Sequence, residues 1–280
     1  MNKIYLIKDS IERAKAFPEV KIYQITGQCN AAIARNIGAK ESSGDVLFFI
    51  DGDMEIIPDF FQIVYKNNDL IHGFVSGQFE NNYYDVKGNF LYKEDYYSTN
   101  IDQYQITTGG LFIIKVDLWN AVNGMNTKYT RSQDIDLGLR LSEKGIKLLR
   151  KKELMAKHHT ISYNDSIRMW STLLNCGEFY RVVLLRDHIV NWQFHKKFLR
   201  ENYTSVFLLI AFIMVFLFEE PMVFLPYFAF IFIRAFINLR KEILRIPSKF
   251  FYFIARDVLI WFALFLFWPQ KVEKEKYKKL

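Results

Sequence analysis

Two carboxylates separated by one glycine are the clearest chemical feature of the chain. Asp51, Gly52 and Asp53 directly follow the apolar run 46–50, which is typical of a strand buried on both faces. Open α/β sheets bind their ligands just beyond the carboxyl ends of such strands. Carboxylate oxygens suit Mg²⁺ or Mn²⁺, which usually keep substrate phosphates among their ligands. The alternative is a solvated acidic turn, because Asp-Gly is a common turn dipeptide.

A second polar cluster opens a predicted helix. Thr130 and Gln133 can form a capping box, and Asp136 and Arg140 have the spacing of a surface ion pair. These roles leave Asp134 unexplained. A carboxylate in the first turn of a helix, if it is held over a cleft, is a candidate general base.

Two adjacent histidines, His158 and His159, follow an apolar stretch. Most histidines are structural, but an imidazole near a dicarboxylate site can complete the coordination of a metal ion. We expect His159, rather than His158, to be the ligand. We also expect Asp53, Asp134 and His159 to face one shared cavity.

Short β-rich runs alternate with helix-like stretches through the first half of the chain, and this alternation predicts an α/β fold with a mostly parallel sheet. Strands are predicted at residues 4–7, 21–25, 46–50, 74–79 and 111–114, and helices at 10–17, 31–41 and 134–144. The stretch 81–103, rich in Tyr and Asn, is predicted to be irregular.

Charge and hydropathy change along the chain. Residues 1–137 hold 13 Lys and Arg against 18 Asp and Glu, whereas residues 138–200 hold 13 against 5. The basic part adjoins the most apolar part, which predicts attraction to membrane phosphates and argues against a nucleic-acid partner. The two cysteines, Cys29 and Cys176, cannot form a disulfide framework, so a reducing compartment is expected.

Three apolar segments follow, at 206–218, 222–233 and 250–268. The first two predict a membrane hairpin, because a buried hairpin in a soluble protein would need a partner to cover it. With the front domain in the cytosol, the hairpin returns the basic stretch 240–249 to the cytosol, as the positive-inside tendency expects. The third segment either dips and returns, lies in the interface with Arg256 and Asp257 among the headgroups, or crosses against that tendency.

The predicted organisation has three parts. Residues 1–165 form the α/β domain, residues 166–202 form basic amphipathic helices at the membrane surface, and residues 203–280 form a membrane region with two or three apolar helices. For the middle part, the alternative is a set of ordinary helices that pack on the domain with solvated charges.

Taken together, these residues resemble glycosyltransferase family 2, the inverting nucleotide-sugar transferases with the GT-A fold. The resemblance covers residues 3–159. Its segments are Ala34-Arg35-Asn36-Ile37-Gly38, Asp51-Gly52-Asp53, Thr107-Thr108-Gly109-Gly110, Asn123-Gly124-Met125-Asn126 and Gln133-Asp134-x-Asp136-Leu137. The family usually has Glu where this chain has Gln133.

The resemblance implies roles for the donor side. Asp53 would bind the metal, and Asp51 would contact the nucleotide ribose or the water shell of the metal. Asp9 would approach the nucleotide base, and Arg35 would lie near the base or the diphosphate. His159 would be a further metal ligand.

On the acceptor side, the resemblance implies that Asp134 deprotonates the acceptor hydroxyl as it attacks the anomeric carbon. Gly109 and Gly110 would form the acceptor-side loop, which borders the donor. Gln133 would supply a hydrogen-bonding side chain to the donor site. The stretch 166–170 does not match the Q-x-x-R-W sequence of processive synthases, so transfer of a single sugar is expected.

The family has a strand and a helix ahead of residues 4–7, and this chain is expected to lack them, giving an N-terminally incomplete sheet. The expected function is metal-dependent transfer from a nucleotide-diphosphate sugar to a lipid-linked or cell-surface glycan acceptor, at the cytosolic face of the plasma membrane. The alternatives are a non-catalytic, transferase-like membrane scaffold and a polyprenyl-phosphate sugar transferase.

Overall fold

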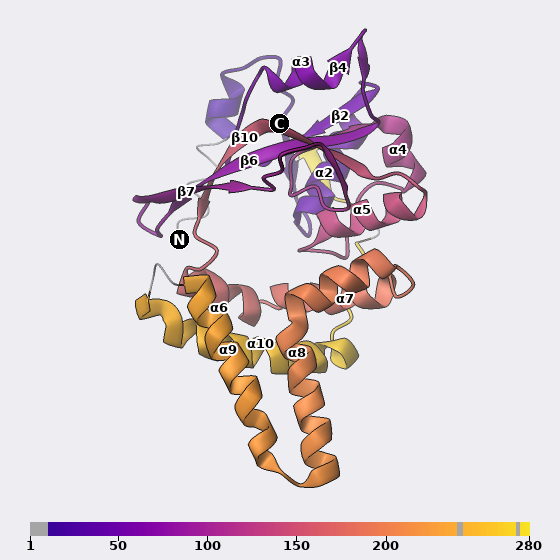
Figure 1. The fold of residues 1–280 in the computed structure, drawn as a ribbon. Coiled ribbons are helices and arrows are strands. Elements are labelled where there is room, and N and C mark those ends of the chain that lie inside the picture. The colour runs from indigo at the N-terminus through magenta and orange to yellow at the C-terminus, as the bar shows by residue number, and fades with distance from the viewer. Residues whose placement is uncertain (1–10, 240–242, 273–274) are drawn as a thin grey trace.

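The computed structural model describes residues 11–239, 243–272 and 275–280. An α/β domain lies above a layer of crosswise helices, from which a two-helix hairpin projects (Figure 1). The strands are β1 (Tyr23–Ile25), β2 (Val46–Phe49), β3 (Met54–Ile56), β4 (Tyr65–Lys66), β5 (Asp69–Leu70), β6 (Phe74–Tyr84), β7 (Phe90–Tyr96), β8 (Gln103–Gln105), β9 (Phe112–Lys115), β10 (Leu148–Ile161) and β11 (Tyr277–Lys279). The α-helices with given bounds are α2 (Ala31–Glu41), α3 (Phe60–Val64), α4 (Val116–Ala121), α5 (Gln133–Glu143), α6 (Ser166–Leu174), α7 (Tyr180–Asp187), α8 (Trp192–Phe218), α9 (Phe224–Leu239) and α10 (Ile246–Leu266).

A seven-stranded sheet organises the domain, in the order β2-β9-β6-β10-β3, with β7 beside β6 and β8 beside β10. The predicted α/β class is confirmed, but the prediction of a mostly parallel sheet is wrong. Within the described residues β6 and β10 pair in parallel, whereas the other pairs in this sheet are antiparallel. The predicted strand at 4–7 lies outside the described residues.

Helices cover both faces of the sheet. Phe112 and Ile114 of β9 pack in the cluster that contains Leu137 of α5. Ile113, between them, packs in the opposite cluster with Phe60 of α3. Because successive side chains of a strand point to opposite faces, this unbroken apolar run serves two cores.

The prediction that residues 81–103 are irregular is wrong. Strand β6 extends to Tyr84 and pairs with β7 in a hairpin. At its turn, the carboxylate of Asp85 accepts hydrogen bonds from the main-chain N–H groups of Lys87 and Asn89, and Gly88 has a φ of +86°. The Asp and Gly of this turn were the available sequence signal.

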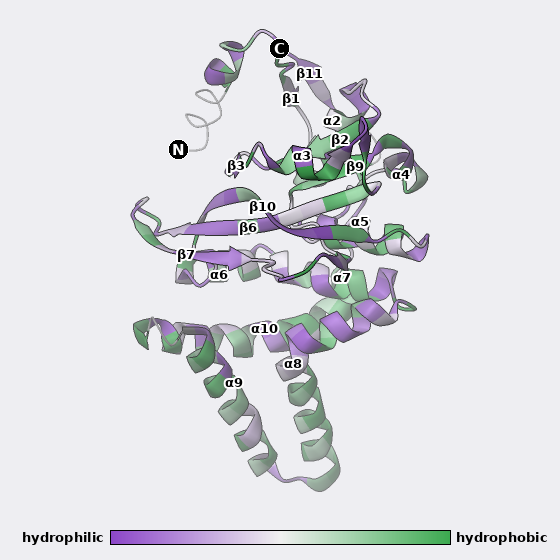
Figure 2. Ribbon diagram, turned by 45° about the horizontal axis from the view of Figure 1, so that its top comes forward, coloured by the Kyte–Doolittle hydropathy of each residue, from purple (hydrophilic) through white to green (hydrophobic). Residues whose placement is uncertain are grey.

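The part of α8 that follows Asn202 and most of α9 are apolar, whereas the start of α8 is charged (Figure 2). Trp192–Phe218 and Pro221–Asn238 are long and apolar enough to cross a membrane, judged among the described residues by length and composition. The expected domain boundary at 202–203 falls at a kink in α8, where Asn202 leaves helical geometry.

Helix α10, the third apolar segment, lies crosswise at the base of the hairpin (Figures 1 and 2). Arg256 and Asp257 are not exposed on it as the headgroup interpretation expects. Both are buried, 2.9 Å apart, and Ser205 Oγ donates to Asp257 at 2.7 Å. The buried Arg256–Asp257 pair therefore connects α10 to Ser205 of α8.

The end of the chain returns to the α/β domain. β11 pairs with β1 in a separate two-stranded antiparallel sheet, and the main-chain N–H of Leu280 donates to the Ile22 carbonyl at 3.0 Å. Thr127 Oγ1 also exchanges hydrogen bonds with the main chain of Val272. The predicted strand 21–25 thus pairs with the C-terminal strand and not with the central sheet.

Candidate active site

Asp51 lies at the end of β2 in contact with Arg35 of α2. Nη2 of the buried Arg35 is 2.5 Å from Asp51 Oδ1 and donates to the Gly110 carbonyl at 3.2 Å. Burial raises the pKa of Asp51; the Arg35 guanidinium lowers it by less, and the charge of Asp53 adds to the rise. Three of the predicted site residues therefore form one connected group.

Gly110 permits the close approach. Its φ is +90°, and a Cβ added there would lie 2.5 Å from Asp51 Oδ2. An L side chain at this position would be strained by its backbone and would collide with the carboxylate.

Asp53 contacts His158, the other histidine of the pair. His158 Nε2 lies 3.2 Å from Asp53 Oδ2, and its Nδ1 lies 2.9 Å from Asn81 Oδ1. The hydrogen bond from His158 lowers the pKa of Asp53, against the opposing effect of burial. The carboxylate is therefore held in its charged form.

The expectation that His159 is the ligand is not supported by this geometry. Its Nδ1 lies 3.1 Å from the Tyr84 hydroxyl and its Nε2 lies 3.6 Å from Glu55, whereas only its main-chain N–H bonds the Asp53 carbonyl. Adjacent side chains of the extended β10 strand point to opposite sides. The His158 ring contacts the Asp53 carboxylate, whereas His159 lines a cavity with Asp53 while its ring nitrogens contact Tyr84 and Glu55.

Asp134 occupies the first turn of α5. Its Oδ2 accepts hydrogen bonds from Thr107 Oγ1 at 3.1 Å and from the main-chain N–H of Gly109 at 3.2 Å. Helix α5 can lie this close because Gly138 faces the Ile106 carbonyl, where a Cβ would overlap the oxygen. The loop 107–110 thus connects Asp134 to Asp51 through two consecutive glycines.

The predicted capping box is not formed. The N-cap of α5 is Ser132, with a φ of +63° and no side-chain capping hydrogen bond. Gln133 Oε1 is buried with no hydrogen-bond partner within the part of the chain that the structure describes. Gln133 is not among the residues that line the cavity at Asp134.

Asp136 is buried, which corrects the expected surface ion pair. It lies 2.7 Å from Arg140 Nη2 and 3.1 Å from Nε2 of the buried His188, which follows α7. The other ring nitrogen of His188 is 2.8 Å from Glu143. This network connects the helix that carries Asp134 to the end of α7.

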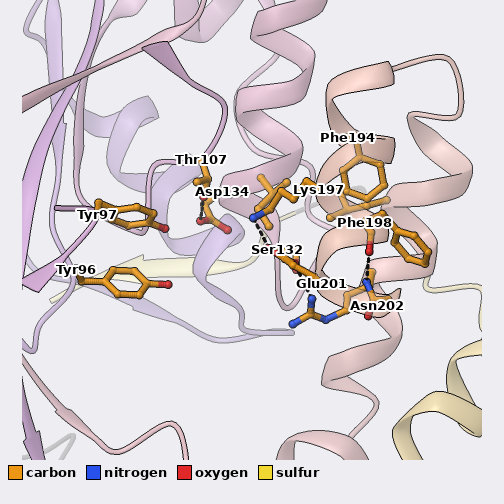
Figure 3. A pocket seen from close by; sticks show the side chains of 13 residues that line it. Tyr96, Tyr97, Thr107, Ser132, Asp134, Phe194, Lys197, Phe198, Glu201 and Asn202 are labelled. Atoms are coloured by element: carbon orange, nitrogen blue, oxygen red, sulfur yellow. Dashed lines mark hydrogen bonds and ion pairs between the residues drawn. The ribbon is translucent and has the colours of Figure 1, made fainter. Parts of the chain in front are cut away.

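Asp134 lines a cavity of about 230 Å³ (Figure 3). Tyr96 and Tyr97 stand on one side, and Lys197 and Glu201 of α8 face Asp134 from the other. Lys197 Nζ is 2.6 Å from Glu201 Oε1, and this glutamate also pairs with Arg181 of α7 at 2.7 Å. The wall opposite Asp134 therefore belongs to the basic middle part of the chain.

Asp53 and His159 line a different cavity, of about 500 Å³, together with Arg168 of α6. The expectation of one cavity shared with Asp134 is wrong for this structure. Asp134 is instead connected through Gly109, Gly110 and Arg35 to Asp51, which lies two residues before Asp53 in the sequence.

Arg150 was not predicted from the sequence, yet it organises the connecting loop. It is fully buried in β10, its Nη2 donates to the Thr107 carbonyl at 2.6 Å, and its Nη1 donates to the Gly77 carbonyl at 2.7 Å. Burial lowers its pKa to about 10. Its guanidinium stacks on Tyr97 at 4.0 Å, a residue held at a φ of +59°. Lys151, Lys152 and Glu153 follow Arg150 directly, so the sequence offered no local signal that it is buried.

The carboxylates and imidazoles at this end of the sheet are few. Within residues 11–239, 243–272 and 275–280, no group of three or more His, Cys, Asp and Glu side chains could hold a metal. Asp53 Oδ2 and His158 Nε2, 3.2 Å apart, would supply two protein ligands to an ion whose remaining ligands come from a substrate and from water. Asp9, predicted to approach a nucleotide base, lies outside the described residues.

A search of curated proteins found no match. One similar solved structure is described as "Crystal structure of GalNAc-T7 with UDP, GalNAc and Mn2+", with 16% identity and a TM-score of 0.45. The alignment covers 58% of this chain and 36% of that one, so the chain spans about a third of that relative. The sequence profile of "Glycosyl transferase family 2" matches residues 8–161, more than half of the chain. The chain belongs to glycosyl transferase family 2.

Proposed function

We propose that the protein is a metal-dependent inverting glycosyltransferase of the hexosyltransferase type. It would move one sugar from a nucleotide-diphosphate donor to a lipid-linked or cell-surface glycan acceptor. The observation that carries this proposal is the connection of Asp134 to Asp51. Asp134 accepts from the Gly109 N–H, and the next residue, Gly110, shares the Arg35 guanidinium with Asp51.

Two cavities, one lined by Asp53 and one lined by Asp134, support separate donor and acceptor sites. The donor diphosphate would lie on the Asp53 side, and the acceptor hydroxyl would lie at Asp134. Asp134 would take the proton of that hydroxyl as its oxygen bonds the anomeric carbon. The bond from that carbon to the diphosphate would break, and its electron pair would leave with the diphosphate, so the configuration inverts.

A divalent ion, Mg²⁺ or Mn²⁺, held by Asp53 and His158 with Asp51 beside it, would neutralise charge on the departing diphosphate. Arg35 restrains the Asp51 carboxylate at 2.5 Å. The main-chain N–H of Gly109 and the Thr107 hydroxyl orient Asp134 and leave its other oxygen available for the proton.

The hairpin of α8 and α9 supports anchoring in the cell membrane. Its apolar side chains are largely exposed, as for Phe216 (86%) and Ile237 (63%), so protein does not cover them. Because β11 pairs with β1, the domain and the tail would lie on the same side of the membrane, with two crossings between them. The basic residues beside the hairpin favour the cytosolic side for both.

The test is transfer from a panel of nucleotide sugars, with the full chain in lipid nanodiscs and Mn²⁺ present. Asp53→Ala and Asp134→Asn should each reduce transfer by about 10³-fold, while the melting temperature stays near that of the wild type. Asp117→Asn, on the exposed face of α4, is the matched control. Retained transfer in either site variant would refute the assigned role. If the wild type also fails to bind Mn²⁺ and donor by calorimetry, the scaffold alternative is favoured.

A further inference from the structure

A third cavity, of about 430 Å³, adjoins the one at Asp134. The two share Tyr97, Thr107 and Lys197 as lining residues. A molecule with its hydroxyl at Asp134 can therefore extend into the third cavity past Lys197.

The third cavity is strongly basic. Lys147, Lys197 and Arg200 line it, and none of the described residues that line it carries a carboxylate. Lys197 is paired with Glu201. For the side chains of Lys147 and Arg200, the described part of the chain offers no ion pair or hydrogen bond. The like charges of these three cations repel one another, and among the described residues Glu201 is the one carboxylate paired with them. A bound anion would remove this repulsion.

The cations come from two elements that the fold brings together. Gln193, Lys197 and Arg200 follow one another at helical spacing on α8, so they lie on one face of that helix. Lys147 precedes β10 in the α/β domain. The cavity thus lies between the catalytic domain and the membrane-proximal helix.

Neutral donors complete the lining. The Oε1 atom of Gln105 accepts from Arg150 Nε at 2.9 Å, which leaves the Gln105 amide N–H₂ for another partner. Gln193 and the Tyr104 hydroxyl also line the cavity. Lysine, arginine and neutral donors together are the groups that bind phosphate oxygens in proteins.

We propose that Lys147, Lys197 and Arg200 bind a phosphate group of the acceptor while its hydroxyl lies at Asp134. The inference rests on the proposed function in naming the ligand as the acceptor. The phosphate could belong to a lipid-linked acceptor or to a soluble phosphorylated one, and the experiment below separates these sources.

The experiment measures binding without turnover. The full chain in nanodiscs, with EDTA present so that no metal bridges to Asp53, is titrated calorimetrically with farnesyl phosphate, farnesol and inorganic phosphate. The double variant Lys147→Glu/Arg200→Glu should bind farnesyl phosphate about tenfold or more weakly than the wild type. The control is Lys196→Glu, an exposed cation on α8 that does not line the cavity, and it should bind within about twofold of the wild type.

Tighter binding of farnesyl phosphate than of inorganic phosphate, both lost in the double variant, would support a lipid-linked source. Equal binding of the two, again lost in the double variant, would support a soluble phosphorylated acceptor. The proposal is overturned if the wild type binds neither phosphate, if farnesol binds as tightly as farnesyl phosphate, or if the double variant binds like the wild type. Because no transfer is measured, failure here is distinct from failure of the Asp53 and Asp134 variants.

Discussion

Arg35 Nη2 lies 2.5 Å from Asp51 Oδ1, so a helix residue 16 positions earlier in the chain restrains the carboxylate that follows β2. The pKa of Asp51 is raised by burial and lowered by Arg35. Arg35→Ala removes the lowering contribution, so Asp51 should keep its proton to a higher pH. We expect the acidic limb of the pH profile of kcat/KM to move upward in this variant. Lys66→Ala changes an exposed cation at the end of β4 and should leave the limb in place. An unmoved limb in Arg35→Ala would contradict the role of the pair.

A methyl group at Gly110 should abolish activity through geometry alone. Gly110→Ala strains a backbone at a φ of +90° and places Cβ 2.5 Å from Asp51 Oδ2. Transfer should fall by about 10²-fold or more, since small misplacements of positioned groups cost that much. Gly38→Ala on helix α2, where a Cβ meets nothing within 4 Å, is the matched control and should retain activity. Equal activity in both variants would count against the close packing of Asp51 on the loop.

The two histidines can be separated by metal affinity. His158→Ala should weaken Mn²⁺ binding, measured with a nucleotide diphosphate by calorimetry, by about tenfold or more. His159→Ala should change it by less than about threefold, because its imidazole faces Tyr84 and Glu55. A larger loss in His159→Ala would restore the expectation drawn from the sequence.

Arg150 should matter for stability as much as for activity. Arg150→Met keeps the bulk of the side chain but leaves the buried Gly77 and Thr107 carbonyls without their donor, at a cost of about 1–3 kcal/mol each. The melting temperature should fall by several degrees, and more than in Lys152→Met, whose side chain is exposed on the same strand. An unchanged melting temperature would show that the buried network is replaceable.

His188 gives the stability a pH dependence of known sign. Burial lowers its pKa, but hydrogen bonds to Asp136 and Glu143 outweigh burial, so the pKa lies above the ordinary 6.5. Its stabilising contribution is therefore fully present below about pH 6.5 and is lost as the pH rises through the folded-state pKa. The melting-temperature difference between the wild type and His188→Gln should be largest in mild acid and shrink toward alkaline pH. A difference that grows with pH would reverse the assignment.

Local signals predicted much of the fold. The Ala-rich stretch 31–41 forms α2 with the predicted bounds, because Asn30 caps it by accepting from the Ile33 N–H at 2.9 Å. The β6–β7 hairpin was not predicted because its polar, Tyr-rich strands lack a strong apolar alternation. The Asp85 and Gly88 of its turn were then the remaining sequence signal for a hairpin.

Some residues of the candidate site could likewise be predicted from the local sequence, and others could not. Asp51 and Asp134 could be predicted from their sequence neighbours. Asp51 follows an apolar run typical of a buried strand, and Asp134 lies in the first turn of a predicted helix. The contacts of Arg150, His158 and Lys197 depend on which strands and helices become neighbours in space, and no local pattern specifies that. The choice between His158 and His159 required the register of β10 against β3 and β6, where His158 pairs with Met54 and Asn81.

The pairing of β11 with β1 has a practical consequence for labelling. Leu280 lies against Ile22, so a fluorescent or enzymatic reporter fused to the last residue would emerge beside the catalytic domain. Its signal would report the compartment that holds the α/β domain. A bulky fusion would also pull on the β1–β11 ladder, so a flexible spacer should precede it.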